Sequence, residues 1–484
     1  MDIDTIYFNG IDVDEGTPAV PAMSAEAFAE QISQVAKLGH TKPANLSELK
    51  FRADQPQDLG VKAGIDLKKL DQAGWGVIFA SDADPTVEQA LTPLLDLRHQ
   101  QAGDKFFRVY KQADGYQVGQ NDNKNKFLKR QGAGPGPADP DRVPYYLLIV
   151  GDPDKIPFQF QTDLDVQYAV GRICFDTPAE YAAYARSAVA AEQLQRPRRL
   201  TFFGVKDDNA ADEAALAVKL SADYLIEPLS KAFGGTAGWQ VETLLGATAT
   251  RAELMRRLGG EETPALLFSA THGLQVRPDN KKKLSQAKFQ GALVCQDPPG
   301  TAEAYVAGKH IDKDANLHGL IAFFFACFSA GTPKEDAYNR LLRMRSGQEP
   351  GPALELTPRP FVSYLPQRLL SAPAGGALAV IGHIERAWPS SFLWGAMPDG
   401  TLPHQTVAFE STLRLLLDGY PVGAAVEFLN ERHAELGSML SALLEEVQFD
   451  APYDRADLIS YWMGDHDAAG YIVIGDPAAR LAVV

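Results

Sequence analysis

Short apolar runs alternate with amphipathic stretches along the chain from residue 69 onward. Each run has the length of a strand and is rich in Leu, Ile, Val and Phe, whereas the amphipathic stretches repeat their apolar positions with a helical period. The predicted strands are residues 75–80, 145–150, 200–205, 241–245, 265–270, 320–326 and 377–381, and the predicted helices are residues 87–99, 178–193, 211–233 and 251–258. Buried strands separated by helices are typical of a mostly parallel sheet with helices on both faces, so we predict an α/β fold.

The pattern divides the chain into three parts. Residues 1–68 mix short apolar pieces with Pro, Gly and acidic residues, and they contain one amphipathic stretch at residues 25–38. No function follows from this segment. Residues 69–195 form a first α/β unit, and residues 196–484 form a second one. A chain of 484 residues agrees with two to four domains, because a domain has on average about 150 residues.

Composition and charge exclude several classes of function. Hydrophobic residues make up 45% of the chain and charged residues 22%, which is typical of a globular protein. A net charge of −16 argues against nucleic acid as a ligand. The chain starts without a basic, apolar leader, and its densest apolar run, residues 320–330, is shorter than the ~20 residues that span a bilayer. With only three cysteines, we expect a cytoplasmic protein that binds no membrane.

Two predicted strands run directly into residues that can carry chemistry. Residues 265–270 are followed by Thr and then His272-Gly273, and residues 320–326 are followed by Cys327. Neighbouring parallel strands end at the same edge of a sheet, so the two side chains can face one another there. A thiolate nucleophile beside an imidazole that protonates a leaving amine forms a Cys-His dyad. Gly273 leaves room for backbone N–H groups to point at a developing oxyanion.

The same residues also have a purely structural interpretation. A cysteine at the end of an apolar strand is often a small buried hydrophobe, and a histidine followed by glycine often forms a turn. Spacing alone leaves both interpretations open for Cys327 and His272. Cys174 and Cys295 lie in apolar, strand-like contexts, and packing is the better interpretation of each.

Other kinds of catalytic site lack their defining residues. The chain contains no GxSxG, HExxH or GxxxxGK[ST] motif, which excludes a serine hydrolase elbow, a zincin helix and a P-loop. A flavodoxin-like nucleotide binder would also lack its phosphate loop. Asp465-His466-Asp467 is interpreted as a polar loop, because a metal site would need a second ligand pair. We predict no metal and no cofactor.

The motifs around His272 and Cys327 resemble those of caspase-like cysteine peptidases of clan CD, specifically the gingipain family and the related CHAT proteases. Further segments resemble gingipain motifs and occur in the same order: residues 148–152, 168–172, 177–180, 379–382, 388–391 and 471–477. The similarity extends over residues 74–481. It implies a caspase-haemoglobinase-like fold of two α/β/α sandwich halves with mostly parallel sheets. Residues 69–195 would be the non-catalytic half and residues 196–484 the catalytic one.

The resemblance assigns a role to each residue of the motifs. Cys327 becomes the nucleophile and His272 the general acid/base, while the backbone N–H groups of Gly273 and Cys327 form the oxyanion hole. An ungapped register places the acidic residue of the family at Asp208, with Asp207 one residue away. These two aspartates could equally cap the helix that follows.

The resemblance also assigns a substrate pocket. Trp388 and Ser329 belong to it, and Lys219 takes the place where arginine-specific gingipains have an aspartate. A cation at that place would favour an acidic or neutral substrate residue over Arg or Lys. Lys219 could also be an exposed helix lysine, and a slip of one helical turn would put Asp223 there instead. The lysine run at residues 281–283, interpreted as solvated, lies in an interval that borders the cleft of caspase-like enzymes.

The predicted function is an intracellular caspase-like cysteine endopeptidase for limited proteolysis of a protein or peptide substrate. We expect latency that is relieved by an activating partner protein or by cleavage, and residues 332–360 are either a rigid lid or a cleavable loop. The alternative is a catalytically silent scaffold or regulatory binding module with the same fold.

Overall fold

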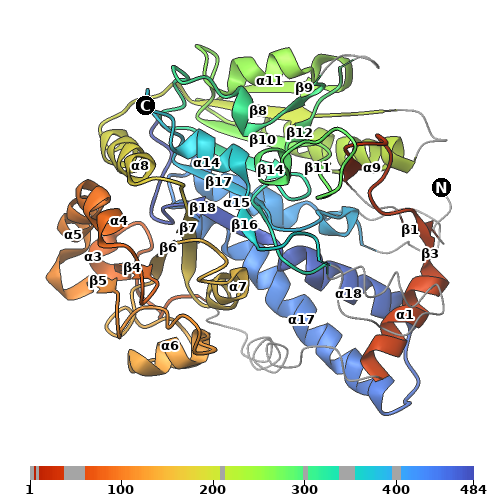
Figure 1. The fold of residues 1–484 in the computed structure, drawn as a ribbon, viewed down its shortest axis with the longest axis horizontal. Coiled ribbons are helices and arrows are strands. Elements are labelled where there is room, and N and C mark those ends of the chain that lie inside the picture. The colour runs from red at the N-terminus through yellow and green to blue at the C-terminus, as the bar shows by residue number, and fades with distance from the viewer. Residues whose placement is uncertain are drawn as a thin grey trace.

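A computed structural model of the chain describes residues 5–6, 10–37, 60–207, 213–297, 303–336, 355–394 and 405–483. Its centre is a ten-stranded sheet in the order β5-β4-β6-β7-β18-β17-β14-β10-β8-β9 (Figure 1). The strands are β4 (Trp75–Phe79), β5 (Phe107–Tyr110), β6 (Tyr146–Val150), β7 (Ala169–Ile173), β8 (Arg199–Gly204), β9 (Gln240–Leu245), β10 (Leu266–Ala270), β14 (Ile321–Phe325), β17 (Ala379–His383) and β18 (Tyr471–Gly475). The predicted α/β fold with a mostly parallel sheet is confirmed.

The two predicted halves share this one continuous sheet. Strand β18 comes from the end of the described chain and lies between β7 of the first half and β17 of the second. It pairs parallel with β7 and antiparallel with β17, whereas all other neighbours in the sheet are parallel. The strands of the first half and β18 therefore point opposite to the other strands of the second half. Only those other strands end at the edge that carries His272 and Cys327.

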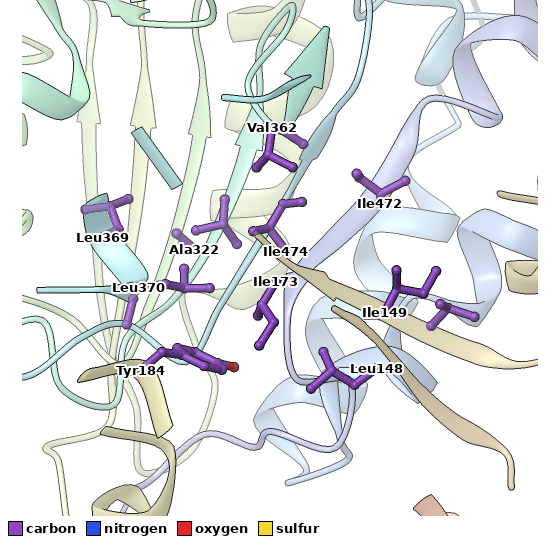
Figure 2. Packing of buried hydrophobic residues seen from close by; sticks show 14 of the residues in the cluster. Leu148, Ile149, Ile173, Tyr184, Ala322, Val362, Leu369, Leu370, Ile472 and Ile474 are labelled. Atoms are coloured by element: carbon purple, nitrogen blue, oxygen red, sulfur yellow. The ribbon is translucent and has the colours of Figure 1, made fainter. Parts of the chain in front are cut away.

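The hydrophobic core follows the continuous sheet across both halves. One buried cluster combines Leu148 and Ile173 from the first half with Ala322 from the second, and Ile474 of β18 lies between them (Figure 2). Tyr184 on the helix after β7 belongs to the same cluster, and its hydroxyl donates a hydrogen bond to the backbone oxygen of Leu378. Shared side-chain packing therefore joins the halves, which makes the sheet one cooperative unit.

Helices alternate with the strands of the sheet, and they include elements at each of the four predicted helical stretches. They are α3 (Leu70–Ala73), α4 (Pro85–Ala90), α5 (Thr92–Phe106), α6 (Lys124–Arg130), α7 (Phe158–Asp165), α8 (Pro178–Ala191), α9 (Glu213–Ser221), α10 (Glu227–Phe233), α11 (Arg251–Arg257), α12 (Gln286–Phe289), α14 (Tyr364–Leu370), α15 (Val407–Leu417), α16 (Val422–Ala425), α17 (Glu427–Gln448) and α18 (Arg455–Ala468). Thr177 and Glu180 form a capping box at the start of α8. A π-helical turn, η1 (Ala222–Ile226), joins α9 to α10, so the helix predicted at residues 211–233 is interrupted.

Short strands and turns build the edge of the sheet around the two motifs. They are β11 (Leu274–Gln275), β12 (Leu293–Val294), β13 (Tyr305–Val306), β15 (Gly331–Thr332), β16 (Phe361–Val362), and the 3-10 turns η2 (Gly246–Thr248), η3 (Gly308–His310) and η4 (Pro389–Ser391). Strand β11 follows His272-Gly273 directly. Strand β11 pairs with β2 (Ile11–Asp12), β12 with β13, and β15 with β16, so these short strands form small sheets of their own beside the two motifs.

The N-terminal part of the chain packs on the second half. It forms β1 (Thr5–Ile6), β2 (Ile11–Asp12), β3 (Met23–Ser24) and α1 (Ala25–Lys37), and α1 contacts both α17 and α18 (Figure 1). Phe28 of α1 meets Trp462 of α18 edge to face at 5.4 Å between ring centroids. No helix in the described part of the chain is long and apolar enough to cross a membrane.

The interpretation of Asp465-His466-Asp467 as a loop is wrong, because all three residues lie on α18. Asp465 and Asp467 are buried there. The sequence misleads because polar side chains on the buried face interrupt the apolar stripe of this helix. Within the described ranges no group of three or more His, Cys, Asp or Glu residues is arranged to hold a metal ion.

Candidate active site

The strands that carry the two motifs are neighbours. Strand β10 pairs parallel with β14 along its full length, from Leu266 opposite Ile321 to Ala270 opposite Phe325. The pairing continues one step further, because the backbone N–H of Thr271 donates to the Phe325 oxygen at 3.1 Å. His272 and Cys327 therefore leave the same edge of the sheet from adjacent positions, as their place at the strand ends predicts.

Gly273 allows the two motifs to touch through their backbones. A Cβ atom at this position would lie 1.8 Å from the carbonyl oxygen of Cys327 and 2.8 Å from its nitrogen. Both atoms belong to the main chain and cannot turn aside. The glycine of the His-Gly motif is thus required by the close approach of the two segments, whatever the backbone N–H groups do in catalysis.

The backbone directly after Cys327 is held in an unusual conformation. Phe328 has a φ of +58°, a region in which bulky residues are strained. Its N–H donates to the Glu385 oxygen at 2.6 Å, and its side chain is fully buried. This turn directs the Cys327 side chain toward the segment after β17, where the thiol donates a hydrogen bond to the Ala387 oxygen at 3.8 Å.

Cys327 is completely buried in this structure. Burial raises the pKa of its thiol to about 12, although the positive charge of Arg386 acts in the opposite direction. Burial also raises the pKa of Cys174 to about 12, and that of Cys295 further. The three cysteines are unpaired with one another. The thiol of Cys327 is therefore neutral, and its place beside the strand that leads to His272 separates it from the two other cysteines.

His272 is also buried, with 5% of its surface exposed. Its carbonyl oxygen accepts a hydrogen bond from the Val294 N–H, so the neighbouring short strand holds its backbone. Its ring nitrogen Nδ1 accepts a hydrogen bond from the backbone N–H of Gly10 at 3.3 Å. A residue from the N-terminal part of the chain therefore contacts the candidate general base.

A buried carboxylate positions the segment that faces the thiol. Asp467 accepts a hydrogen bond from the Trp388 N–H at 2.8 Å, and it accepts another from the Ser391 hydroxyl. The Ser391 hydroxyl also lies 2.6 Å from the Tyr471 hydroxyl. Trp388 has no exposed surface and packs with α1, α17 and α18. Asp467 thus holds residues 388–391, which directly follow the backbone oxygen of Ala387.

A second buried ion pair lies on the other side of that segment. Arg386 donates to both carboxylate oxygens of Asp336 at 2.9 Å, and it also contacts Glu385 at 3.1 Å. The guanidinium lies 5.7 Å from the ring centroid of Phe328. Because Asp336 follows β15, this pair ties the chain after the Cys motif to the segment after β17.

The other predicted site residues have these positions. Ser329 is buried and joins two strands, because its hydroxyl donates to the Phe324 oxygen and accepts from the His383 N–H. Lys219 lies on α9, which contacts η4, and its Nζ atom is 3.2 Å from a carboxylate oxygen of Asp223. Asp207 is exposed, and Asp208 lies outside the described residues.

The sequence analysis missed Gly10, Asp467 and the Arg386–Asp336 pair. Gly10 lies 262 residues from its partner His272, and a lone glycine gives no sequence signal for such a contact. Asp336 and Arg386 are 50 residues apart and likewise belong to no motif. A buried acid on a helix, such as Asp467, becomes visible only once the helix is recognised.

The comparisons with known proteins give structural similarity only. No family model and no curated protein matches the chain. A solved structure of a protease is similar with a TM-score of 0.47 and 12% sequence identity, over 86% of this chain and 80% of that chain. A Saccharomyces cerevisiae separase-securin complex is similar with a TM-score of 0.30 and 10% identity, over 69% of this chain and 16% of that one.

Proposed function

We propose that this chain is a caspase-like cysteine endopeptidase with Cys327 as nucleophile and His272 as general acid/base. The observation that carries the proposal is the pairing of β10 with β14, which brings the two residues to one edge of the sheet. The strained turn at Phe328 supports it, because such conformations cluster at functional sites. The motif resemblance to gingipain-type and CHAT peptidases agrees with these roles.

The reaction follows from the two side chains. The Cys327 thiolate attacks the substrate carbonyl carbon, and a C–S bond forms while the carbonyl oxygen takes the negative charge. The His272 imidazolium gives its proton to the amide nitrogen, so the C–N bond breaks and the amine leaves. Water then attacks the thioester with neutral His272 as base. The acid product leaves, and the thiolate and imidazolium are restored.

The proposal includes a latent resting form. A fully buried, neutral thiol cannot attack a peptide, so the chain must change before it can act. The trigger is an activating partner protein or a cleavage, and the substrate is a protein or peptide that is cleaved at few sites. Three free cysteines suit a reducing compartment, and we propose a cytoplasmic location.

The substrate pocket is proposed to exclude basic residues. Lys219 is the cation assigned to it, and its ion pair with Asp223 offsets part of that charge. The expected order of preference is therefore neutral first, then acidic, then Arg or Lys. A peptide panel that varies the residue before the cleaved bond, read with the wild type and with Lys219→Asp, tests this order.

A catalytically silent scaffold is the second candidate. The observation that favours it is the complete burial of Cys327, which is also what a structural cysteine shows. In that case the thiol and imidazole only fill space at the end of the sheet, and the chain acts through a binding surface.

Covalent labelling and turnover separate the two candidates. In the activated chain, a peptidyl thiol-reactive probe is expected to modify Cys327 and neither Cys174 nor Cys295. Cys327→Ala should abolish peptide cleavage, and the matched Cys295→Ala should retain it. His272→Ala should lower turnover about 10²–10⁴-fold without unfolding the protein. Cleavage retained by Cys327→Ala would overturn the proposal.

A further inference from the structure

Residues 10–13 run along one edge of β11, and residues 13–15 form a turn in which the Gly16 N–H donates to the Asp12 oxygen at 3.0 Å. Strand β2 within this segment runs parallel to β11. The N–H of Ile11 donates to the Gly273 oxygen at 3.3 Å, and the N–H of Val13 donates to the Gln275 oxygen at 3.0 Å. These contacts use main-chain atoms only, so the same edge can pair with any extended peptide.

Gly10 occupies the position over the sulfur. Its φ is +108°, and a Cβ atom there would lie 3.3 Å from the Sγ atom of Cys327. Its N–H points at Nδ1 of His272. In the proposed reaction the leaving nitrogen of the substrate takes its proton from the His272 ring. The Gly10 nitrogen therefore occupies the place of the leaving nitrogen. Residues 11–13 then correspond to substrate residues on the leaving side of the cleaved bond.

Charges on the segment and on the surrounding rim are complementary. Asp12 lies 3.0 Å from the guanidinium nitrogen Nε of Arg277. The carboxylate of Asp14 accepts hydrogen bonds from the N–H groups of Lys281 at 2.7 Å and Lys282 at 3.1 Å. The hydrogen bond from Lys281 lowers the pKa of Asp14 and keeps it ionised. Residues 281–283 are exposed, as predicted, and Lys281 and Lys282 are also partners of acidic residues.

An apolar anchor completes the contact. Val13 is almost fully buried and packs with Leu274 and Val276 in a small cluster beside β11. Its carbonyl oxygen accepts a hydrogen bond from Nζ of Lys282 at 2.6 Å. The ladder from Gly10 to Val13 and the acidic turn that follows thus meet an apolar and basic surface.

We propose that the β11 edge with Arg277, Lys281 and Lys282 is the docking site for the leaving side of an extended acidic substrate, and that residues 10–15 occupy it as an internal competitor. The proposal deepens the proposed function and rests on it for the statement that the docked peptide is a substrate. The proposed substrates are peptides with acidic residues after the cleaved bond. Residues 10–15 are the segment that covers the Cys327 thiol.

The first test displaces the segment. Gly10→Val adds a side chain against Cys327, whereas Gly16→Ala changes a glycine of similar conformation, φ +67°, whose added Cβ meets nothing within 4 Å. Alkylation of the full chain by iodoacetamide at pH 8, mapped by mass spectrometry, should speed up at least about tenfold at Cys327 in the first variant only. Unchanged labelling of Cys327 in a folded Gly10→Val protein overturns the proposal.

Unfolding is distinguished within the same experiment. If Gly10→Val unfolds the chain, all three cysteines become reactive together. Lys281→Glu/Lys282→Glu then replaces it, because that variant repels the acidic segment without touching the core. Selective labelling of Cys327 in the double variant supports the proposal, and labelling as slow as in the wild type overturns it.

The second test supplies the peptide from outside. A fluorescent peptide with the sequence of residues 10–16 is added to full-length Gly10→Val, and its counterpart carries Asn and Gln in place of the acidic residues. The acidic peptide should bind at least about tenfold more tightly, and it should protect Cys327 from iodoacetamide. Equal binding of the two peptides, or binding without protection, overturns the docking site.

The two proposals fail in different ways. Thiol protection is measured without turnover, so a chain that binds the acidic peptide but cleaves none keeps the docking site and loses the peptidase. A chain that cleaves neutral and acidic peptides equally well keeps the peptidase and loses the docking site.

Discussion

The contact between Gly273 and Cys327 makes a quantitative prediction. In Gly273→Ala the new Cβ would lie 1.8 Å from the Cys327 oxygen, whereas real contacts of this kind do not fall below 3.0 Å. The backbone after β14 must therefore move by about 1 Å. Overpacking of this kind costs about 1–3 kcal/mol of folding free energy. A misplacement of about 1 Å at a reacting group also lowers turnover about 100-fold.

Urea denaturation and peptide turnover measure the two effects separately. Gly235→Ala is the matched control, because its added Cβ meets nothing within 4 Å and its φ is not in the left-handed region. The control should keep both its unfolding midpoint and its activity. An unchanged midpoint together with unchanged turnover in Gly273→Ala would refute the requirement for close approach.

Three further predictions concern the buried groups around the thiol. Arg386→Met should lower the free energy of unfolding by about 3–5 kcal/mol, because it leaves the buried Asp336 without its guanidinium partner. The double variant Arg386→Met/Asp336→Leu should recover most of that loss, as measured by urea denaturation. Asp467→Ala should cost about 1–3 kcal/mol, because the buried N–H of Trp388 loses its acceptor; an unchanged midpoint would contradict this. Cys327 with a pKa of about 12 should be alkylated at pH 8 about 1,000-fold more slowly than a free thiol, and the rate should rise with pH up to that value.

The raised pKa of Cys327 also fixes the sign of its effect on stability. The folded chain holds this proton up to about pH 12, whereas the unfolded thiol loses it near a pKa of about 8.5. The contribution of this thiol to the free energy of unfolding is therefore fully present below about pH 8.5, and it falls as the pH rises toward 12. Cys327→Ala should flatten this part of the curve of unfolding free energy against pH.

The sequence predicts the sheet well because its strands are buried on both faces. Residues 265–270 and 320–326 are continuous apolar runs, and they become β10 and β14 within one residue at either end. The helix predicted at residues 87–99 is instead two helices, α4 and α5, because Pro93 starts a new first turn. Apolar periodicity identifies an element but does not show where a proline divides it.

The N-terminal part of the site could not be predicted from the same signals. The contact of Gly10 with His272 depends on a main-chain ladder between strands of two residues each. Neither strand has a hydrophobic pattern long enough to predict it. The lysine run at residues 281–283 has no sequence feature that distinguishes a docking rim from a solvated loop. Its partners become known only when residues 10–15 are placed beside it.

Burial and reactivity conflict at Cys327, and the nature of the cover resolves the conflict. Residues 10–15 are held by about six hydrogen bonds, each worth about 1 kcal/mol net, and by one buried valine worth about 1.5 kcal/mol. Ordering the segment costs about 1 kcal/mol per residue, so only a few kcal/mol keep it in place. A peptide present at about 100 times its dissociation constant for the same edge gains about 2.7 kcal/mol, which is comparable, and can displace it. On the proposed function, Cys327 is therefore a masked nucleophile beneath a replaceable segment, and displacement of that segment is the step that its activity requires.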